Sequence, residues 1–200
     1  MVGLRERKKL RTRQALIEAA LRLFDERGYE ETTLAEIAAE AEVSTRTFFS
    51  YFASKEDVIF FDSDERMERT LEILASREPG EPLADLLLRL IRSALMWASA
   101  DDFSLEHSAV RMRLLSTVPA LQARALHLLF DTQLRLAQAL RDAYPDELDE
   151  VEAATAVGGL IGAVKLAVMV SLSRGDSHEQ IRETVSRAAD IAIRGLHTIG

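Results

Sequence analysis

Apolar residues recur at helical spacing along nearly the whole of this 200-residue chain. One such stripe comprises Leu10, Ile17, Ala20, Leu21 and Phe24. Gly28 follows it and predicts a C-cap, because glycine adopts the backbone conformations that end helices. No stretch alternates apolar and polar residues for long enough to predict a sheet. Since 48% of the residues are hydrophobic, the core can be sizeable, and the sequence predicts an all-α fold.

Capping signals divide the chain into further helices. Thr33 and Glu36 form a capping box, Ser44 and Ser54 are N-caps, and "SHEQ" from Ser177 is a second box. The Pro/Gly cluster Pro79–Pro82 ends a helix that starts at Lys55. The expected helices after Gly28 are Thr33–Ala41, Ser44–Tyr51, Lys55–Arg77, Leu83–Ala100, Ser104–Thr117, Pro119–Ala143, Glu147–Ser173 and His178–Thr198.

The stretch "VSTRTFFSYFASKED", Val43 to Asp57, concentrates aromatic residues. Half of the chain's 12 aromatic residues lie between Phe48 and Phe61. Phe48 and Phe52 are four residues apart and should pack inward, whereas Phe49 and Tyr51 should point elsewhere. An aromatic core patch with a solvated hydroxyl face is the alternative interpretation.

The two short helices Thr33–Ala41 and Ser44–Tyr51 are joined by a turn too tight for an antiparallel hairpin. This spacing is typical of a helix-turn-helix, whose second helix enters the DNA major groove. A groove-facing ring can touch a thymine methyl group, and hydroxyl and basic side chains can reach bases and phosphates.

The charge is uneven. The first 24 residues hold seven Lys/Arg and two Glu, a net charge of +5, which leaves −13 for the remainder of a chain of net charge −8. A chain with a basic N-terminal segment and an otherwise acidic sequence can bind DNA through that segment. An N-terminal tail that is only solvated would have the same charge distribution.

The segment "TTLAEIAAEAEVSTRTFFSYFASKEDV" resembles the N-terminal signature of the TetR family of transcriptional regulators, and the likeness extends from about Leu10 to Val58. It implies a regulator, most often a repressor, that binds a palindromic operator on double-stranded DNA as a homodimer and is released by a small-molecule effector. An activator of the same family is an alternative. It also implies that the basic arm Arg5–Arg13 lies along the DNA backbone or in the minor groove. The implied DNA-binding residues are Arg11, Arg13, Thr33, Ser44, Thr45, Arg46, Thr47, Phe49, Tyr51 and Lys55.

Two residues depart from the family pattern. Glu42 stands where a turn glycine is common, which predicts a turn without positive φ. Arg46 stands where the recognition helix often has glycine, and it places a bidentate donor in the groove.

The resemblance divides the chain into a helix-turn-helix DNA-binding domain, 1–54, and a helical ligand-binding and dimerisation domain, 55–200. Small residues on the last two helices favour a dimer interface there, although they could equally pack inside one subunit. The candidate ligand-binding residues are Trp97, His107, Arg111, Lys165 and Met169. A weaker likeness to an actinobacterial subgroup implies an acyl-CoA-like effector.

Several classes are not expected. The chain has no cysteine, which excludes disulfides and thiolate metal sites and fits a cytoplasmic protein. Lys165 interrupts the apolar run Ala153–Ser173, which predicts a buried helix of a soluble protein and no membrane span. "GDSH" at Gly175 resembles a serine hydrolase block but is explained by helix capping. The sequence has no nucleophile elbow, no phosphate-binding glycine loop and no HExxH motif, so no enzyme and no cofactor is predicted. A helical protein-interaction scaffold is the remaining alternative, and it would leave the surface Thr45–Phe49 unexplained.

Overall fold

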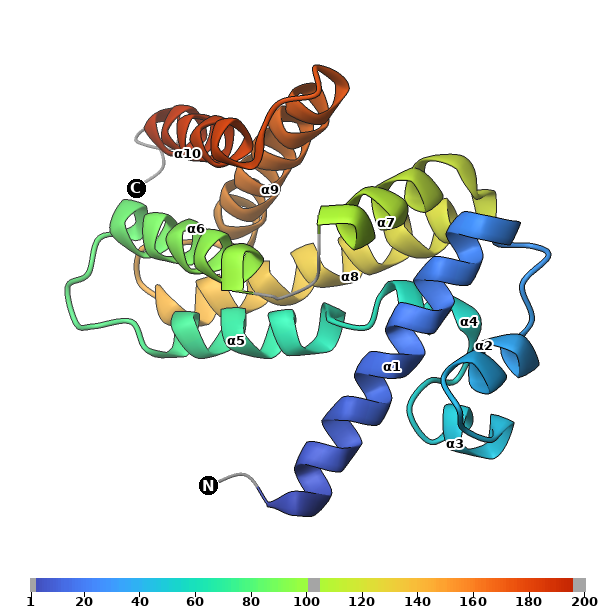
Figure 1. The fold of residues 1–200 in the computed structure, drawn as a ribbon. Helices are drawn as coiled ribbons and strands as arrows, with labels where there is room; N and C mark the ends of the chain where they lie inside the picture. The colour runs from blue at the N-terminus through green and yellow to red at the C-terminus, as the bar shows by residue number, and fades with distance from the viewer. Residues whose placement is uncertain (1–2, 101–104, 196–200) are drawn as a thin grey trace. The chain divides into compact units, whose positions relative to one another are not determined.

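The computed structural model describes residues 3–100 and 105–195, without the side chains of 97–100 and 105–109. These residues form helices and no strand, which confirms the all-α prediction. The described chain divides into two compact units (Figure 1). Unit 1 contains the residues up to Asp64 and those from 105 to Leu126, and unit 2 contains Glu65 to 100 and His127 to 195.

Unit 1 is built around the second half of its first helix. Its helices are α1 (Leu4–Arg27), α2 (Leu34–Glu40), α3 (Thr45–Phe49), α4 (Lys55–Ile59), α7 (Leu105–Thr117) and the beginning of α8 (Pro119–Ala143). Their common core includes Leu16, Ile17, Leu21, Phe24, Ile37, Phe48, Val58 and Leu121, all buried.

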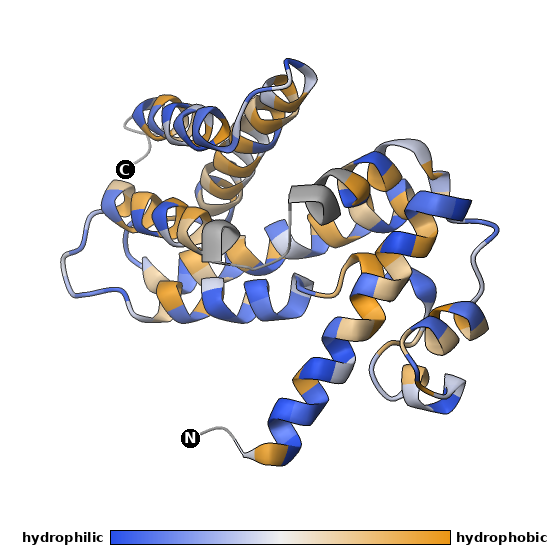
Figure 2. Cartoon of the chain, viewed as in Figure 1, coloured by the Kyte–Doolittle hydropathy of each residue, from blue (hydrophilic) through white to orange (hydrophobic). Residues whose placement is uncertain are grey.

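Helix α1 begins at Leu4, so the basic segment expected as an arm is helical. Figure 2 shows its first half as mostly hydrophilic, and the residues from Leu4 to Arg11 are exposed. Gly28 ends the helix as predicted: its φ is +93°, and its N–H donates to the Phe24 carbonyl at 3.1 Å.

Helices α2 and α3 have the predicted caps. The Glu36 N–H donates to Thr33 Oγ1 at 3.3 Å and the Thr33 N–H donates to Glu36 Oε2 at 2.9 Å, which completes the capping box. The turn between the helices differs from the prediction, because Glu42 has a φ of +54°. The turn therefore keeps the left-handed conformation, and glutamate occupies it at a steric cost.

The helix expected from Lys55 to Arg77 is interrupted. α4 ends at Ile59 and α5 runs from Ser63 to Ala75, with a turn closed by the Ser63 N–H on the Phe60 carbonyl at 3.0 Å. Neither glycine nor proline marks this junction in the sequence. Long-range contacts stabilise it: Phe61 and Asp62 interact with Arg13 and Arg111, from α1 and α7.

Unit 2 consists of most of α5, α6 (Leu83–Ala100), the remainder of α8, α9 (Glu150–Ser173) and α10 (His178–Gly195). Its core includes Met67, Leu74, Leu86, Leu87, Leu140, Tyr144, Ala156, Leu160 and Ala189. α9 starts three residues later than predicted, at a capping box between Asp149 and Glu152.

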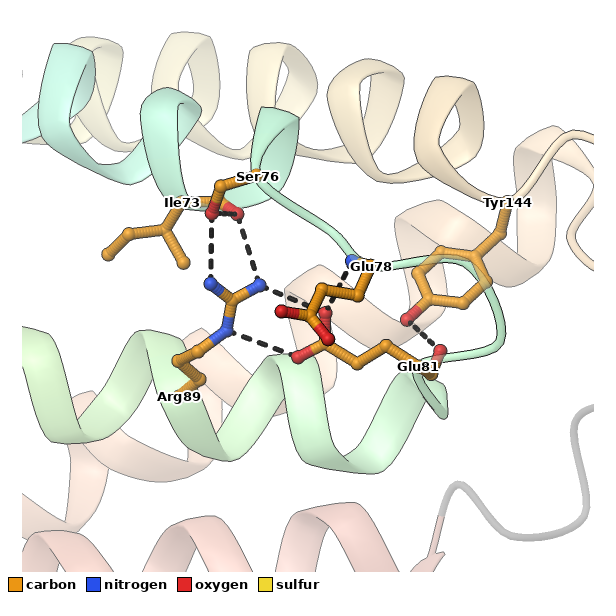
Figure 3. Close-up of polar contacts among 6 residues, drawn as sticks. All are labelled: Ile73, Ser76, Glu78, Glu81, Arg89 and Tyr144. Atoms are coloured by element: carbon orange, nitrogen blue, oxygen red, sulfur yellow. Dashed lines mark hydrogen bonds and ion pairs between the residues drawn. The ribbon is translucent and has the colours of Figure 1, made fainter.

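The Pro/Gly turn between α5 and α6 is fixed by polar side chains (Figure 3). Arg89 holds Glu81 through two nitrogen–oxygen contacts, Nε–Oε1 at 3.1 Å and Nη2–Oε2 at 3.0 Å, and its Nη1 donates to Ser76 Oγ at 2.9 Å. The Tyr144 hydroxyl donates to the Glu81 carbonyl at 2.9 Å. The guanidinium of Arg77 lies 3.9 Å from the centroid of the Tyr144 ring. The turn is therefore held from α6 and from the end of α8.

By its length and composition, helix α9 is apolar enough to cross a membrane. However, only 22% of its most apolar 18-residue stretch is buried in the structure. The prediction of a buried helix is therefore wrong for much of its surface. Leu166 and Met169 are 66% and 61% exposed. Figure 2 shows α9 as largely hydrophobic, so unit 2 by itself leaves apolar surface uncovered.

Candidate nucleic-acid interface and effector pocket

Helix α3 presents a polar and aromatic surface on one side and a core residue on the other. Thr45, Arg46 and Phe49 are exposed, the last at 56%, whereas Phe48 is fully buried. Phe52 is also buried, which confirms the inward placement of Phe48 and Phe52. The exposed side offers a bidentate cation, a hydroxyl and an aromatic ring to a ligand, the groups that read base edges and thymine methyl groups.

Two of the predicted hydroxyl contacts are helix caps. Ser44 Oγ accepts from the Thr47 N–H at 3.1 Å and lies 2.8 Å from Thr47 Oγ1. Thr33 Oγ1 donates to Glu36 Oε2 at 2.7 Å. The hydrogen bonds from Thr33 hold the pKa of the Glu36 carboxyl below its ordinary value. Tyr51 is half-buried against the unit 1 core, so it does not point freely outward as expected.

Lys55 interacts with the exit of α1. Its Nζ donates to the Tyr29 carbonyl at 2.8 Å and to the Thr32 carbonyl at 3.4 Å. The Tyr29 hydroxyl donates to Glu56 Oε1 at 2.7 Å. Burial by itself would raise the pKa of Glu56, but the hydrogen bond from Tyr29 and those from its own backbone and Ser54 hold it below its ordinary value. Burial of the Tyr29 hydroxyl raises the pKa of Tyr29, and the hydrogen bond to Glu56 and the negative charge of Glu56 raise it further.

Arg11 and Arg13 differ in their surroundings. Arg11 is exposed on α1, as a residue that meets phosphates must be. Arg13 is half-buried, donates to the Phe61 carbonyl, and lies over the rings of Phe52 and Phe61 at 5.9 and 5.6 Å from their centroids. Its guanidinium is therefore engaged inside unit 1 rather than held out on an arm.

Unit 2 contains an apolar cavity of about 160 Å³ between α5, α6, α8 and α9. Its lining is Thr70, Leu74, Leu87, Leu90, Ile91, Ala94, Leu136, Leu140, Val157, Leu160 and Ile161. Thr70 carries the polar side chain of this set, and its hydroxyl donates to the Arg66 carbonyl at 2.7 Å. Such a cavity suits an apolar ligand or the apolar part of a larger one.

None of the predicted ligand residues that are described lines this cavity. Arg111 belongs to unit 1, where its Nη2 donates to Asp62 Oδ1 at 3.0 Å. Lys165 and Met169 are exposed on α9. Although Lys165 as a residue is exposed, desolvation of its ammonium and the charge of Arg66 lower its pKa. The side chains of Trp97 and His107 lie outside the described residues. Sequence reasoning missed the lining itself, because its leucines and isoleucines have the spacing of ordinary core residues.

No metal centre is found, since the residues that the structure describes contain no group of three or more His, Asp or Glu side chains placed to hold an ion.

Comparison with known proteins points to one family. The family model "Bacterial regulatory proteins, tetR family" matches residues 16–60. The HTH-type transcriptional regulator TcmR of Streptomyces glaucescens is 38% identical over 154 residues, which is 74% of this chain and 67% of that protein. The fatty acid metabolism regulator protein of Bacillus subtilis (strain 168) is 25% identical over 171 residues, 86% of this chain and 80% of that one.

Solved structures share the fold over nearly the whole length. A TetR-family regulator from Mesorhizobium loti has a TM-score of 0.64 at 18% identity, covering 95% of this chain and 96% of that chain. Thermus thermophilus FadR, a TetR-family repressor solved with lauroyl-CoA, has a TM-score of 0.52 at 23% identity, covering 92% of each chain. The chain therefore belongs to the TetR family of bacterial transcriptional regulators, and it is a DNA-binding regulator rather than an enzyme.

Proposed function

We propose that this regulator is a cytoplasmic repressor that binds a palindromic operator as a homodimer and is released by an amphipathic effector held in unit 2. The observation that carries the DNA-binding part is the α3 surface, where exposed Thr45, Arg46 and Phe49 lie on a helix anchored by buried Phe48. Since one subunit presents one such helix, a two-fold dimer would read two half-sites.

The proposed base contacts come from the exposed residues of α3. Arg46 would bind a guanine edge through two hydrogen bonds, Phe49 would touch a thymine methyl group and Thr45 would hydrogen-bond a base. Arg11 and the other exposed cations of α1 would neutralise phosphates. Ser44 and Thr47 share one hydroxyl–hydroxyl hydrogen bond, which leaves one hydroxyl proton of the pair to donate to a phosphate, whereas Thr33 would first have to give up a hydrogen bond to Glu36. Lys55 and Tyr51 would reach phosphates only by leaving part of their present contacts.

The exposed face of α9, together with α10, is the proposed dimer interface. Gly158, Gly162, Leu166 and Met169 recur at helical spacing on that face. A Cβ added at either glycine would meet nothing within 4 Å among the described residues, so packing inside one subunit does not account for them. Two copies of this face would bury the exposed apolar side chains and bring two helix pairs together, with glycines allowing close approach.

The effector is proposed to place an apolar chain in the unit 2 cavity and a polar end near Lys165. Lys165 lies one helical turn beyond Ile161, which lines the cavity, and Arg66 lies one turn before Thr70. Two cations beside an apolar cavity suit a carboxylate or phosphate on an acyl chain, and an acyl-CoA is a molecule of that class. A related fold has been solved with lauroyl-CoA. Met169 would belong to the dimer face rather than to this pocket.

The test is selection of genomic fragments by the purified protein, repeated with a panel of acyl-CoAs and free fatty acids as competitors. A palindromic motif released by one of these compounds would support the operator, the dimer and the effector class together. Binding without release by any of them would remove the effector class and leave the operator. No sequence-specific enrichment would contradict the proposed DNA contacts of α3. A reporter gene behind the selected motif separates repression from activation.

A further inference from the structure

We propose that Arg13 and Arg111 are positioning residues for operator binding, which hold Phe61 from two helices and thereby fix the α4–α5 junction of unit 1. This inference rests on the DNA binding proposed above, and it assigns to Arg13 a role other than phosphate contact and to Arg111 a role other than effector contact.

Arg13 joins three parts of unit 1. It lies on α1, it donates to the carbonyl of Phe61 in the α4–α5 junction, and its guanidinium lies within cation–π distance of Phe52 and Phe61. Phe52 is three residues beyond the end of α3 and is buried in the unit 1 core. Arg13 is therefore in contact with both the segment that follows the reading helix and the junction that follows α4.

Arg111 contacts the same junction from α7. Its guanidinium lies 4.7 Å from the centroid of the Phe61 ring, and its two terminal nitrogens lie 3.0 and 3.5 Å from the Asp62 carboxylate oxygens. Asp62 is 9% exposed. Removing the cation from a carboxylate as buried as that of Asp62 costs free energy. The Arg111–Asp62 ion pair therefore strongly favours one position of the α4–α5 junction.

The two arginines thus meet on one aromatic ring, and the consequence concerns the direction of α1. Residues Leu4 to Arg11 are exposed and residues 12–15 are half-buried, so Arg13 lies where α1 starts to be covered by the rest of unit 1. The basic half of α1 projects from that contact. Loss of the Arg13–Phe61–Arg111 arrangement would allow the α3–α4 segment to take several orientations relative to the basic half of α1, and each orientation that mismatches the operator lowers the apparent affinity.

Salt dependence separates this role from direct phosphate contact. A cation that neutralises a phosphate contributes about one unit to the slope of log affinity against log salt, and its removal flattens that slope. A residue that positions other cations lowers affinity at every salt concentration, while the number of neutralised phosphates and the slope stay the same.

The experiment measures the affinity of the full-length protein for its selected operator at several salt concentrations, by fluorescence anisotropy. The variants are Arg13→Gln, Arg111→Gln and their double mutant. The matched controls are Arg11→Gln, on the exposed part of α1, and Arg113→Gln, on the same helix as Arg111. The second control removes the exposed ion pair between Arg113 and Asp25. Circular dichroism at the assay temperature tests whether each variant is folded.

We expect Arg13→Gln and Arg111→Gln each to weaken operator binding by about tenfold, the size of one desolvated cation–π or ion-pair contact, with an unchanged salt slope. The double mutant should lose less than the product of the two, because both residues act on one ring. Arg11→Gln should flatten the slope, and Arg113→Gln should leave affinity unchanged. Should Arg111→Gln unfold the protein, Arg111→Lys, which keeps the charge but loses the planar stack, should give a smaller loss with the same unchanged slope.

A flattened slope for Arg13→Gln, or wild-type affinity for folded Arg111→Gln, would overturn the inference while leaving the proposed function intact. Absence of operator binding by the wild-type protein would instead remove the proposed function, and the inference with it.

Discussion

Lys55 contacts both the backbone and the ring of Tyr29, just beyond the end of α1. Its Nζ donates to the Tyr29 carbonyl at 2.8 Å and lies 4.2 Å from the centroid of the Tyr29 ring. The same ammonium group also reaches the Thr32 carbonyl, so it satisfies backbone acceptors between α1 and α2 that no helix provides for.

We therefore expect Lys55→Met to lower the free energy of unfolding by about 1 to 2 kcal/mol, because charged hydrogen bonds to two carbonyls are lost. Urea denaturation measures the change. Lys9→Met, at an exposed position of α1, is the control and should be within about 0.5 kcal/mol of wild type. Equal stability of both variants would mean that the Lys55 contacts contribute nothing.

Glu42→Gly should stabilise the protein by about 0.5 to 1 kcal/mol. Glutamate at a φ of +54° carries a steric cost that glycine does not, and this gain exceeds the extra entropy that glycine loses on folding. Ala39→Gly, on exposed α2 backbone with ordinary helical geometry, should have the opposite sign and a similar size. Thermal unfolding of the two variants side by side checks the difference in sign.

Arg46→Ala should cost about 1 to 3 kcal/mol of binding on the selected operator and relax base preference at one position of each half-site. Stability should hardly change, since Arg46 is exposed. Competition binding against operators with single base changes is the measurement. An equal loss on every sequence would show that Arg46 contacts only phosphate.

Leu166→Glu should convert the proposed dimer into monomers, because it places a charge in the centre of the exposed α9 face. Leu134→Glu is a matched control, since Leu134 is 70% exposed on α8 and lies outside that face. Sedimentation velocity distinguishes the two. A monomeric wild-type protein, or a dimer that survives Leu166→Glu, would place any self-association elsewhere.

The Tyr29–Glu56 hydrogen bond should make stability depend on pH in the acid range. The pKa of Glu56 is held below its ordinary value of 4.5, so the ionised carboxylate favours the folded state. Its contribution is fully present above pH 4.5 and is lost as the pH falls through the folded pKa. Glu56→Gln should therefore be less stable than wild type at neutral pH, and the gap should narrow at acid pH.

Chemical denaturation across the acid range, from neutral pH down to below the ordinary glutamate pKa, tests this prediction. Tyr29→Phe removes the donor hydroxyl and should abolish part of the same pH dependence. If the stability of Glu56→Gln falls in parallel with that of wild type, the bond does not hold the Glu56 pKa down.

Capping chemistry made much of the helical architecture predictable. Thr33 and Ser177 sit three residues before Glu36 and Gln180, and these pairs form their capping boxes from residues within one turn. The inward positions of Phe48 and Phe52 follow from their spacing alone. These signals depend only on residues within one or two helical turns, so they can be read from the sequence without knowledge of the tertiary structure.

The features that sequence reasoning missed depend on distant contacts. Arg13 and Arg111 reach the α4–α5 junction across 48 and 49 residues, and no local pattern distinguishes an arginine that pairs with Asp62 from one that waits for a ligand. The unit 2 cavity could not be predicted from the sequence for a related reason. Its lining comes from four helices, and each helix contributes residues with the spacing of ordinary core residues.

The proline- and glycine-rich turn between α5 and α6 would be the first choice for inserting a peptide tag, because such turns are usually solvated and tolerant. Here Glu81 is fixed by Arg89 and Tyr144, so an insertion between Pro79 and Pro82 would separate two helices that the turn holds together. A fluorophore or affinity tag for operator-binding work should therefore be attached elsewhere, away from α3 and from the exposed face of α9.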